Sequence, residues 1–205
     1  DYRGRVPDQA KILAGSAYAL LRPEFARERD AALDRREAGG PARRILISLG
    51  TTDPNGIASV LTEQVLNAAP DCAIDVVLSP QAPSLEPMSD LAQRHPGVSV
   101  HVDSVQMADL IRDADIAIGA AGTTSWERCC LGLPTVALVM ADNQRDGAAG
   151  LEAAGAAVAV QCVKDVAPTL KRLCNDLALL GRMSAAAFAI VDGQGTIRAR
   201  EFMLG

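Results

Sequence analysis

The chain is most constrained by a regular alternation that begins at Arg44, where short runs of β-branched residues are separated by longer amphipathic stretches. The short runs have the composition of buried strands, and the stretches between them have the length and periodicity of helices. Strands that alternate with helices form parallel sheets covered on both faces. The pattern therefore predicts an α/β fold, a doubly wound parallel sheet of six strands at Ile45–Leu49, Ile74–Leu78, Val98–His101, Asp115–Gly119, Thr135–Val139 and Ala157–Val160.

Helices are expected between these strands, and several carry start or stop signals. Ser104 is expected to cap the helix that follows it, and Gly132-Leu133-Pro134 ends the helix before the fifth strand. Further helical segments are expected after Val163, after Arg182 and near the C-terminus. The helices between strands are predicted at Gly56–Ala68, Ser84–Arg94, Val105–Asp113, Thr123–Leu131 and Gln144–Ala154.

The first 41 residues are predicted to be a segment of their own, apart from a domain at 42–205. Its expected parts are a short helix, an apolar strand, a charged helix and a Gly-Gly-Pro linker, at Gln9–Ala14, Tyr18–Leu21, Glu24–Glu37 and Gly39-Gly40-Pro41. The chain begins at Asp1 without an initiator Met, so we expect it to be truncated at its front.

Charge and composition exclude several classes of protein. Residues 1–44 hold ten Lys and Arg against seven Asp and Glu, a balance of +3; the remainder holds ten against 18, a balance of −8, which together give −5. The mixed signs of the charged helix favour a solvated face over a nucleic-acid patch. Only six residues are Phe, Trp or Tyr, which argues against stacking on single strands. We expect no nucleic-acid partner.

The cysteine content and the hydropathy of the chain indicate which cellular compartment suits it. Five cysteines, an odd number without a C-x-x-C spacing, argue against a disulfide framework or a zinc site, and no metal or cofactor is expected. A reduced, cytoplasmic setting fits this usage best. No apolar run is long enough to span a bilayer and no signal peptide is recognisable, so no stable membrane anchor is expected.

Two loops carry most of the expected chemistry. In an open Rossmann-like sheet, ligands bind beyond the carboxyl ends of the strands where the strand order reverses, and an order of 3-2-1-4-5-6 brings the loops after strands one and four together. These loops are Gly50-Thr51-Thr52-Asp53-Pro54-Asn55 and Gly119-Ala120-Ala121-Gly122-Thr123-Thr124-Ser125. Each precedes a helix, whose free amides and dipole attract an anion such as a diphosphate. The alternative is a tight turn with Ser/Thr caps, and neither loop has a Walker or G-x-G-x-x-G sequence.

Three polar side chains near these loops are candidates for binding. Glu127 lies one turn into the predicted helix at Thr123, where its carboxylate can accept ribose hydroxyls or merely complement the helix dipole. Asn143 and Gln144, after the fifth strand, can bond sugar hydroxyls or cap a helix. His95 and His101 have no evident carboxylate or nucleophile beside them, so no catalytic residue is assigned.

Four segments together resemble one enzyme family, the PseG-type UDP-2,4-diacetamido-2,4,6-trideoxy-β-L-altropyranose hydrolases and their spore-coat polysaccharide relatives. The segments are Tyr18-Ala19-Leu20-Leu21-Arg22-Pro23-Glu24-Phe25, Gly50-Thr51-Thr52-Asp53, Gly122-Thr123-Thr124-Ser125-Trp126-Glu127 and Asn143-Gln144. Residues 98–155 resemble, more distantly, the nucleotide domain of the peptidoglycan N-acetylglucosaminyltransferase. The resemblance implies the C-terminal domain of a GT-B fold, in which two Rossmann-like domains face each other across a cleft.

The resemblance also implies a function, namely holding the UDP part of a UDP-sugar while water attacks the anomeric carbon. Gly50, Thr51, Thr52, Gly122, Thr123, Thr124 and Ser125 would face the diphosphate, Glu127 the ribose, Ser104 and Val105 the uracil, and Asn143 with Gln144 the sugar. The general base would lie in an N-terminal domain missing from this chain. Two alternatives stay open: the donor domain of a UDP-sugar glycosyltransferase, and a nucleotide-binding module without catalysis.

Overall fold

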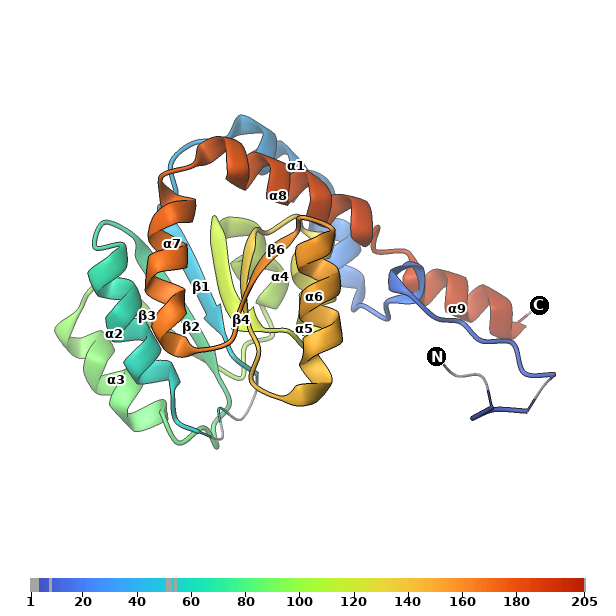
Figure 1. Ribbon diagram of the computed structural model, residues 1–205, viewed down its shortest axis with the longest axis horizontal. Helices are drawn as coiled ribbons and strands as arrows, with labels where there is room; N and C mark the ends of the chain where they lie inside the picture. Colours follow the sequence, from blue (N-terminus) through green and yellow to red (C-terminus); the bar gives the residue numbers. More distant parts are fainter. Residues whose placement is uncertain (1–3, 8, 51–52, 54, 205) are drawn as a thin grey trace.

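The computed structural model describes residues 4–7, 9–50, 53 and 55–204, and its centre is a sheet of six parallel strands (Figure 1). The order β3-β2-β1-β4-β5-β6 confirms the predicted topology. Each strand lies within a residue of its predicted bounds. The strands are β1 (Arg44–Ser48), β2 (Ala73–Leu78), β3 (Val98–Val102), β4 (Ile116–Ala120), β5 (Thr135–Leu138) and β6 (Ala157–Val160).

The helices cover both faces of the sheet, because alternate strand residues point to opposite sides. Ile45 and Ile47 face the core under α2, α3 and α7, whereas Leu46 between them faces the core under α1, α4, α5 and α6. Helix α8 adds residues to both cores. The bounds are α1 (Pro23–Ala38), α2 (Ala58–Ala68), α3 (Leu85–Arg94), α4 (Met107–Asp113), α5 (Thr124–Cys130), α6 (Arg145–Ala153), α7 (Val166–Cys174), α8 (Leu177–Ile190) and α9 (Gly195–Leu204).

Three short 3-10 turns complete the described elements, η1 (Ser16–Tyr18), η2 (Asp142–Gln144) and η3 (Val163–Asp165). Most helices lie within two residues of their predicted bounds. The segment predicted after Arg182 was placed too late, since α8 begins at Leu177. Asp176 fixes this start, because its carboxylate accepts from the Leu179 amide at 2.8 Å.

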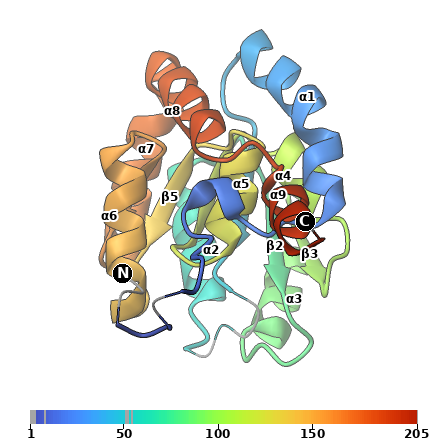
Figure 2. The same ribbon diagram turned by 90° about the vertical axis from the view of Figure 1, so that its right-hand side faces the viewer.

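Two predictions ahead of the sheet are wrong. Residues 10–14 form no helix. The segment is short and mostly exposed, so it lacks the packing that stabilises a helix of this length. Tyr18–Leu21 is not a strand: Tyr18 ends the turn at residues 16–18, and the Leu21 carbonyl accepts from Thr196 Oγ1 of α9 at 2.8 Å instead of from a neighbouring strand. Arg198 of α9 donates to the carbonyl of Ala17 in the same turn. The pair formed by η1 and α9 projects from the body of the sheet (Figures 1 and 2).

The charged helix is confirmed as α1, but it is not simply a solvated face. Phe25 and Ala32 are buried in the same core as α4 and α5. Arg29 donates to the carbonyl oxygens of Phe188 and Cys130, which lie at the ends of α8 and α5. Arginine on α1 therefore satisfies carbonyls that helices leave unpaired at their C-termini, which the sequence pattern alone did not indicate.

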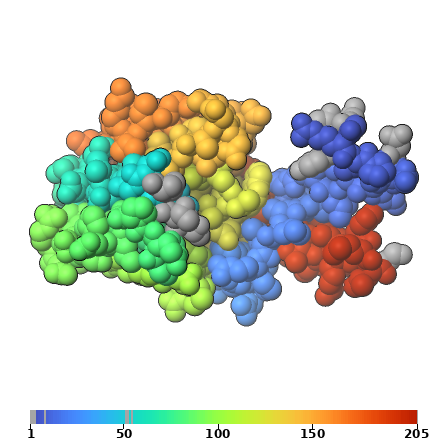
Figure 3. Space-filling model, turned by 90° about the horizontal axis from the view of Figure 1, so that it is seen from below, coloured from blue at the N-terminus to red at the C-terminus, as the bar shows by residue number. Residues whose placement is uncertain are grey.

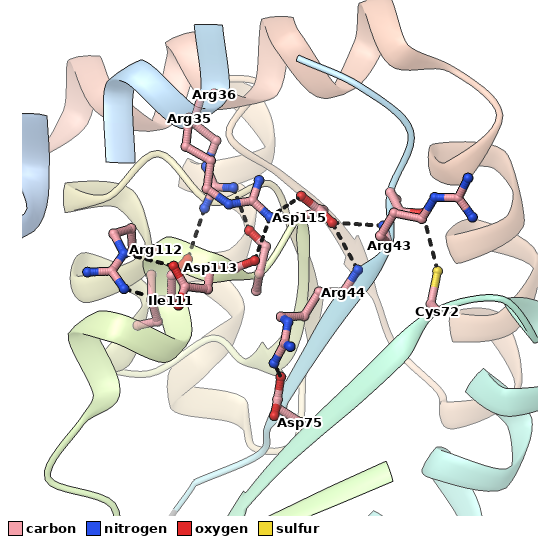
Figure 4. A network of polar contacts seen from close by, with 12 residues as sticks. Arg35, Arg36, Arg43, Arg44, Cys72, Asp75, Ile111, Arg112, Asp113 and Asp115 are labelled. Atoms are coloured by element: carbon pink, nitrogen blue, oxygen red, sulfur yellow. Dashed lines mark hydrogen bonds and ion pairs between the residues drawn. The ribbon is translucent and has the colours of Figure 1, made fainter. Parts of the chain in front are cut away.

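A polar network at the amino edge of the sheet fixes how α1, β1 and β4 meet (Figure 4). The Asp115 carboxylate accepts from the backbone amides of Arg43 and Arg44 at 2.8 and 2.9 Å and pairs with Arg35 at 2.7 Å. Arg36 donates to Ile111 O at 2.9 Å. Because these contacts lie where the strands begin, they leave the opposite edge, where the strands end, free of this network.

Within the described ranges, no single helix has the length and apolarity needed to cross a bilayer. The stretch of Val163–Cys174 with Leu177–Leu204 meets that test only as a pair bent by 104°.

Candidate functional site

The site is built at the carboxyl edge of the sheet, between β1 and β4. Ser48 pairs with Gly119 in the parallel register, so the loops after the two strands start side by side. The strand order reverses at this point, as predicted, which is where open α/β sheets bind ligands. Figure 3 views the molecule from this side, with the loop regions after β1, β4 and β5 gathered on one face.

The loop after β1 does not offer the free helix amides that the sequence led us to expect. Asp53 is fully buried, and its carboxylate accepts from the amides of Ile57 and Ala58, both at 3.1 Å, and from the Ser84 hydroxyl. The first amides of α2 are thus bound to an internal anion. Gly50 is exposed, with φ of 107°, a backbone conformation that favours glycine. Thr51 and Thr52 lie outside the described residues.

The turn between β4 and α5 differs from the loop after β1, because no described residue occupies its first amides. The amides of Ser125 and Trp126 donate to Gly122 O and Thr123 O, both at 3.0 Å. Among the described residues, none accepts from the amides of Gly122, Thr123 or Thr124. A Cβ at Gly122 would meet nothing within 4 Å, so the turn borders open space. Unpaired amides at the start of a helix are the groups that bind anions in other proteins.

Arg128 lies beneath this turn and was not among the predicted site residues. Its side chain is only 2% exposed, and its Nη2 donates to Ala120 O at 2.8 Å and to Ser125 Oγ at 3.0 Å. The Ser125 hydroxyl is therefore directed inward, away from a ligand on the outer surface. Burial lowers the pKa of Arg128 to about 10, which leaves the side chain charged at neutral pH.

Glu127 is half-buried and lines a hollow of about 430 Å³. Thr123 and Trp126 of the same helix form one wall with it, and Gly15 with residues 18–21 forms the other. Burial raises the pKa of Glu127, while the charges of Arg22 and Arg128 act in the opposite direction. The described carboxylate thus faces a cavity large enough for part of a nucleotide, as its predicted role requires.

The loop after β3 forms a second hollow, of about 260 Å³, that includes Ser104 and Val105. Val105 is 79% exposed. Ser104 does not cap the helix. Its Oγ accepts from the Gln106 amide at 3.1 Å, and α4 begins only at Met107.

His101 also lines this second hollow, and the expectation that it has no carboxylate partner is wrong. Its Nε2 lies 2.7 Å from Asp75 Oδ1, and Arg44 pairs with the other oxygen of that carboxylate at 2.7 Å. The partner was missed because Asp75 lies 26 residues earlier, on the neighbouring strand β2.

Asn143 and Gln144 lie in η2, directly after β5. The Gln144 side-chain oxygen accepts from the Met140 amide at 3.0 Å, which leaves its NH₂ group and the second lone pair of the oxygen for a ligand. Asn143 is exposed. In the part of the chain that the structure describes, no group of three or more His, Cys, Asp or Glu could hold a metal ion.

Solved structures define the class to which this fold belongs. MurG of Acinetobacter baumannii aligns with 98% of this chain and 58% of its own, with a TM-score of 0.65 and 19% identity. The Neisseria meningitidis UDP-GlcNAc 2-epimerase, bound to UDP-GlcNAc, aligns with 80% of this chain and 45% of its own, with a TM-score of 0.65 and 15% identity. The chain has the Rossmann-like α/β fold of a GT-B domain.

Two named proteins are similar to this chain in sequence. The spore coat polysaccharide biosynthesis protein SpsG of Bacillus subtilis is 28% identical over 97% of this chain and 60% of its own length. The UDP-2,4-diacetamido-2,4,6-trideoxy-beta-L-altropyranose hydrolase of Campylobacter jejuni is 27% identical over 76% of this chain and 53% of its own length. The chain is thus similar in sequence to these two proteins and has the fold of a GT-B domain.

The match to these relatives is partial in length. An uncharacterized protein of Methanocaldococcus jannaschii is 30% identical over 64% of this chain but only 28% of its own length. The chain thus spans 28% to 60% of the curated relatives that it matches. No protein-family model matches the chain.

Proposed function

We propose that this chain is the UDP-sugar-binding half of a nucleotide-sugar hydrolase in the biosynthesis of a surface polysaccharide or a pseudaminic acid-type sugar. Water would attack the anomeric carbon and give up a proton to a general base, the bond from that carbon to the UDP oxygen would break, and UDP and free sugar would leave. The hydrolase name belongs to the Campylobacter jejuni relative, and the similarity in sequence over 76% of this chain supports its transfer to this chain.

The observation that carries the proposal is the combination of unpaired amides and a cavity carboxylate on one short helix. Amides at Gly122 to Thr124 would donate to the diphosphate, and Glu127, one turn later, would accept from the ribose hydroxyls. Ser104 and Val105 would meet the uracil at the neighbouring hollow, and Asn143 with Gln144 would meet the sugar. Gly50, Thr51 and Thr52 stay candidate diphosphate contacts, without the help of the first α2 amides.

The general base is proposed to come from another domain of a longer protein. His95 is the C-cap residue of α3, away from the carboxyl edge, and His101 lines the hollow proposed for the uracil rather than the sugar. The pair formed by η1 and α9 leaves Leu20, Met203 and Leu204 exposed, an apolar surface that a second domain would cover. The domain boundary near residue 41 stays a prediction. Helix α1 lies before that boundary, yet it shares a hydrophobic core with the sheet.

A glycosyltransferase using the same donor site is the second candidate. The likeness to MurG favours it at the level of fold. The two candidates differ only in whether water or a sugar hydroxyl attacks the anomeric carbon, so the acceptor side of the cleft decides between them. A nucleotide-binding module without catalysis is the third possibility that the same binding site allows.

The proposal is tested by calorimetric titration of this chain with UDP in the presence of EDTA. We expect saturable binding of one UDP per chain without a divalent metal. Glu127→Ala should weaken UDP binding by about 1–3 kcal/mol, the range for hydrogen bonds to a charged partner, and leave binding of uracil alone nearly unchanged. An equal loss for uracil and UDP would show that Glu127 does not contact the ribose.

A further inference from the structure

Arg128 is a buried cation that forms no ion pair or hydrogen bond with a described carboxylate, although the charge of the neighbouring Glu127 acts on it through space. Its guanidinium bonds only to neutral oxygens: Ala120 O, Ser125 Oγ and, at 3.5 Å, Thr124 Oγ1. Its Nε has no hydrogen-bond partner among the described residues. Removing a charge from water without a counter-ion is strongly unfavourable, and most buried charges in proteins are paired. The fold therefore keeps at this position a charged side chain whose desolvation is energetically unfavourable.

The position of Arg128 is fixed by the absence of a side chain at Gly119. A Cβ at Gly119 would lie 2.2 Å from Arg128 Nη1 and 2.8 Å from Ser48 O. The guanidinium thus occupies the space above the last residues of β4, beside the end of β1. This is the floor of the candidate site, directly under the turn that carries the unpaired amides.

The contacts of Arg128 also set the orientation of that turn. The guanidinium draws the Ala120 carbonyl and the hydroxyls of Thr124 and Ser125 toward the protein interior. Because these oxygens bond to Arg128, they do not accept from the amides of the turn. The amides of Gly122 and Thr123 have no acceptor among the described residues, so they are free to bind a ligand outside the turn. The inner face of the turn therefore carries a positive charge, and its outer face carries hydrogen-bond donors.

We propose that Arg128 is the positioning residue and internal counter-charge for the diphosphate of the nucleotide, an inference that rests on the proposed function. The ligand would lie outside the turn and the guanidinium inside it, separated by one layer of backbone. Because Arg128 is buried, its attraction to the diphosphate would be screened less than the attraction between two surface charges. Arg128 does not itself touch the ligand.

A purely structural role for Arg128 makes a different prediction. If the side chain only held the turn together, its loss would weaken every ligand of the site to a similar extent. If its charge acts on the diphosphate, its loss would weaken UDP selectively and spare uridine, which has the same base and ribose but no phosphate. The ratio of the two affinities separates these roles, because changes in turn stability common to both ligands cancel in it.

The test is to measure UDP and uridine binding to wild-type chain and to Arg128→Met, Arg128→Gln and Arg128→Lys. We expect Arg128→Met to lower the UDP affinity by about tenfold or more and the uridine affinity by less than about threefold, and Arg128→Lys to keep the wild-type ratio within about threefold. Arg29→Met is the matched control, since Arg29 also bonds to a carbonyl of α5, but at its far end. That variant should leave the ratio unchanged.

Arg128→Gln makes the test independent of whether Arg128→Met folds. Glutamine keeps a hydrogen-bond donor for the Ala120 carbonyl but carries no charge. The ratio of UDP affinity to uridine affinity should therefore fall as far in Arg128→Gln as in Arg128→Met. Equal losses of UDP and uridine in a folded neutral variant, or an unchanged UDP affinity, would overturn the inference while leaving the proposed function intact. A wild-type chain that binds neither ligand would overturn both.

Discussion

Glu127 combines a half-buried position with a role that needs a negative charge. The hollow beside it gives the carboxylate access to a ligand, and the same burial makes the ionised form less favourable. Burial of this kind is common at binding sites, because a partly desolvated acceptor forms stronger hydrogen bonds than an exposed one. In the proposed function, Glu127 would add to binding at some cost to the stability of the free protein.

The raised pKa of Glu127 predicts opposite effects of pH on stability and on binding. The folded state holds the proton of Glu127 more tightly than the unfolded chain does, so ionisation above the ordinary value of 4.5 lowers stability as the pH rises. Relative to Glu127→Gln, the wild-type chain should lose stability through this window. Binding should change the other way, because protonation as the pH falls removes the negative charge and turns one of the two acceptor oxygens into a donor.

Denaturant titrations and uridine titrations across this pH range check both effects. Glu127→Gln is the control in each, since its amide does not titrate and is close to the glutamate in size. A pH dependence of stability and uridine binding that is the same in both proteins would contradict the assigned environment of Glu127.

Strand and helix positions were largely predictable, whereas contacts between distant elements were not. Ile45, Leu46 and Ile47 form an apolar run whose alternation places them in two cores, and local sequence suffices to predict such a strand. By contrast, Arg128 follows Glu127 on a short amphipathic helix, where a charged residue is usually solvated. Only its packing on Gly119 and Ala120, at the end of the preceding strand, reveals that it is buried.

The loop after β1 shows the same limit within the predicted site. Its sequence predicted a helix N-terminus correctly, but not that Asp53 would occupy the first amides of α2. An aspartate shortly before a helix is a capping signal, so this contact was recoverable from the sequence. Its bond with Ser84 was not, because that residue comes from another loop.

Packing between β4 and α5 predicts the effect of Gly119→Ala on stability. The added Cβ would overlap both the Arg128 guanidinium and the Ser48 carbonyl, and the latter is held in the sheet. We expect a loss of about 1–3 kcal/mol in the free energy of unfolding, as for other overpacked sites. Chemical denaturation measures this change.

Gly150→Ala in α6 is the matched control for that substitution. A Cβ there would meet nothing within 4 Å, and alanine favours helix, so a gain of about 0.5–1 kcal/mol is expected. Wild-type stability in Gly119→Ala would mean that Arg128 is free to move out of the position described.

At the scale of the whole molecule, we propose that binding belongs to this chain and that catalysis needs a further domain. The sheet, the β4–α5 turn and the hollow beside Glu127 are all present in this chain, and we propose that the general base comes from another domain. The chain spans 28% to 60% of the curated relatives that it matches.

This separation predicts that the 205-residue chain binds UDP but releases none from a UDP-sugar. Incubation with UDP-N-acetylglucosamine, followed by chromatographic detection of UDP, should show no turnover above the rate without protein. Measurable release that Glu127→Ala abolishes would place the base within this chain and contradict the proposed division of roles.

The most direct test of the central claim is a crystal structure of the chain with UDP. The account predicts the diphosphate within hydrogen-bond distance of the amides of residues 122–124, the ribose hydroxyls on the Glu127 carboxylate, and Arg128 still buried beneath the turn. A nucleotide bound elsewhere, with the β4–α5 turn unoccupied, would contradict it; one such place is a hollow of about 270 Å³ lined by residues 138–140 and 161–163, at the ends of β5 and β6.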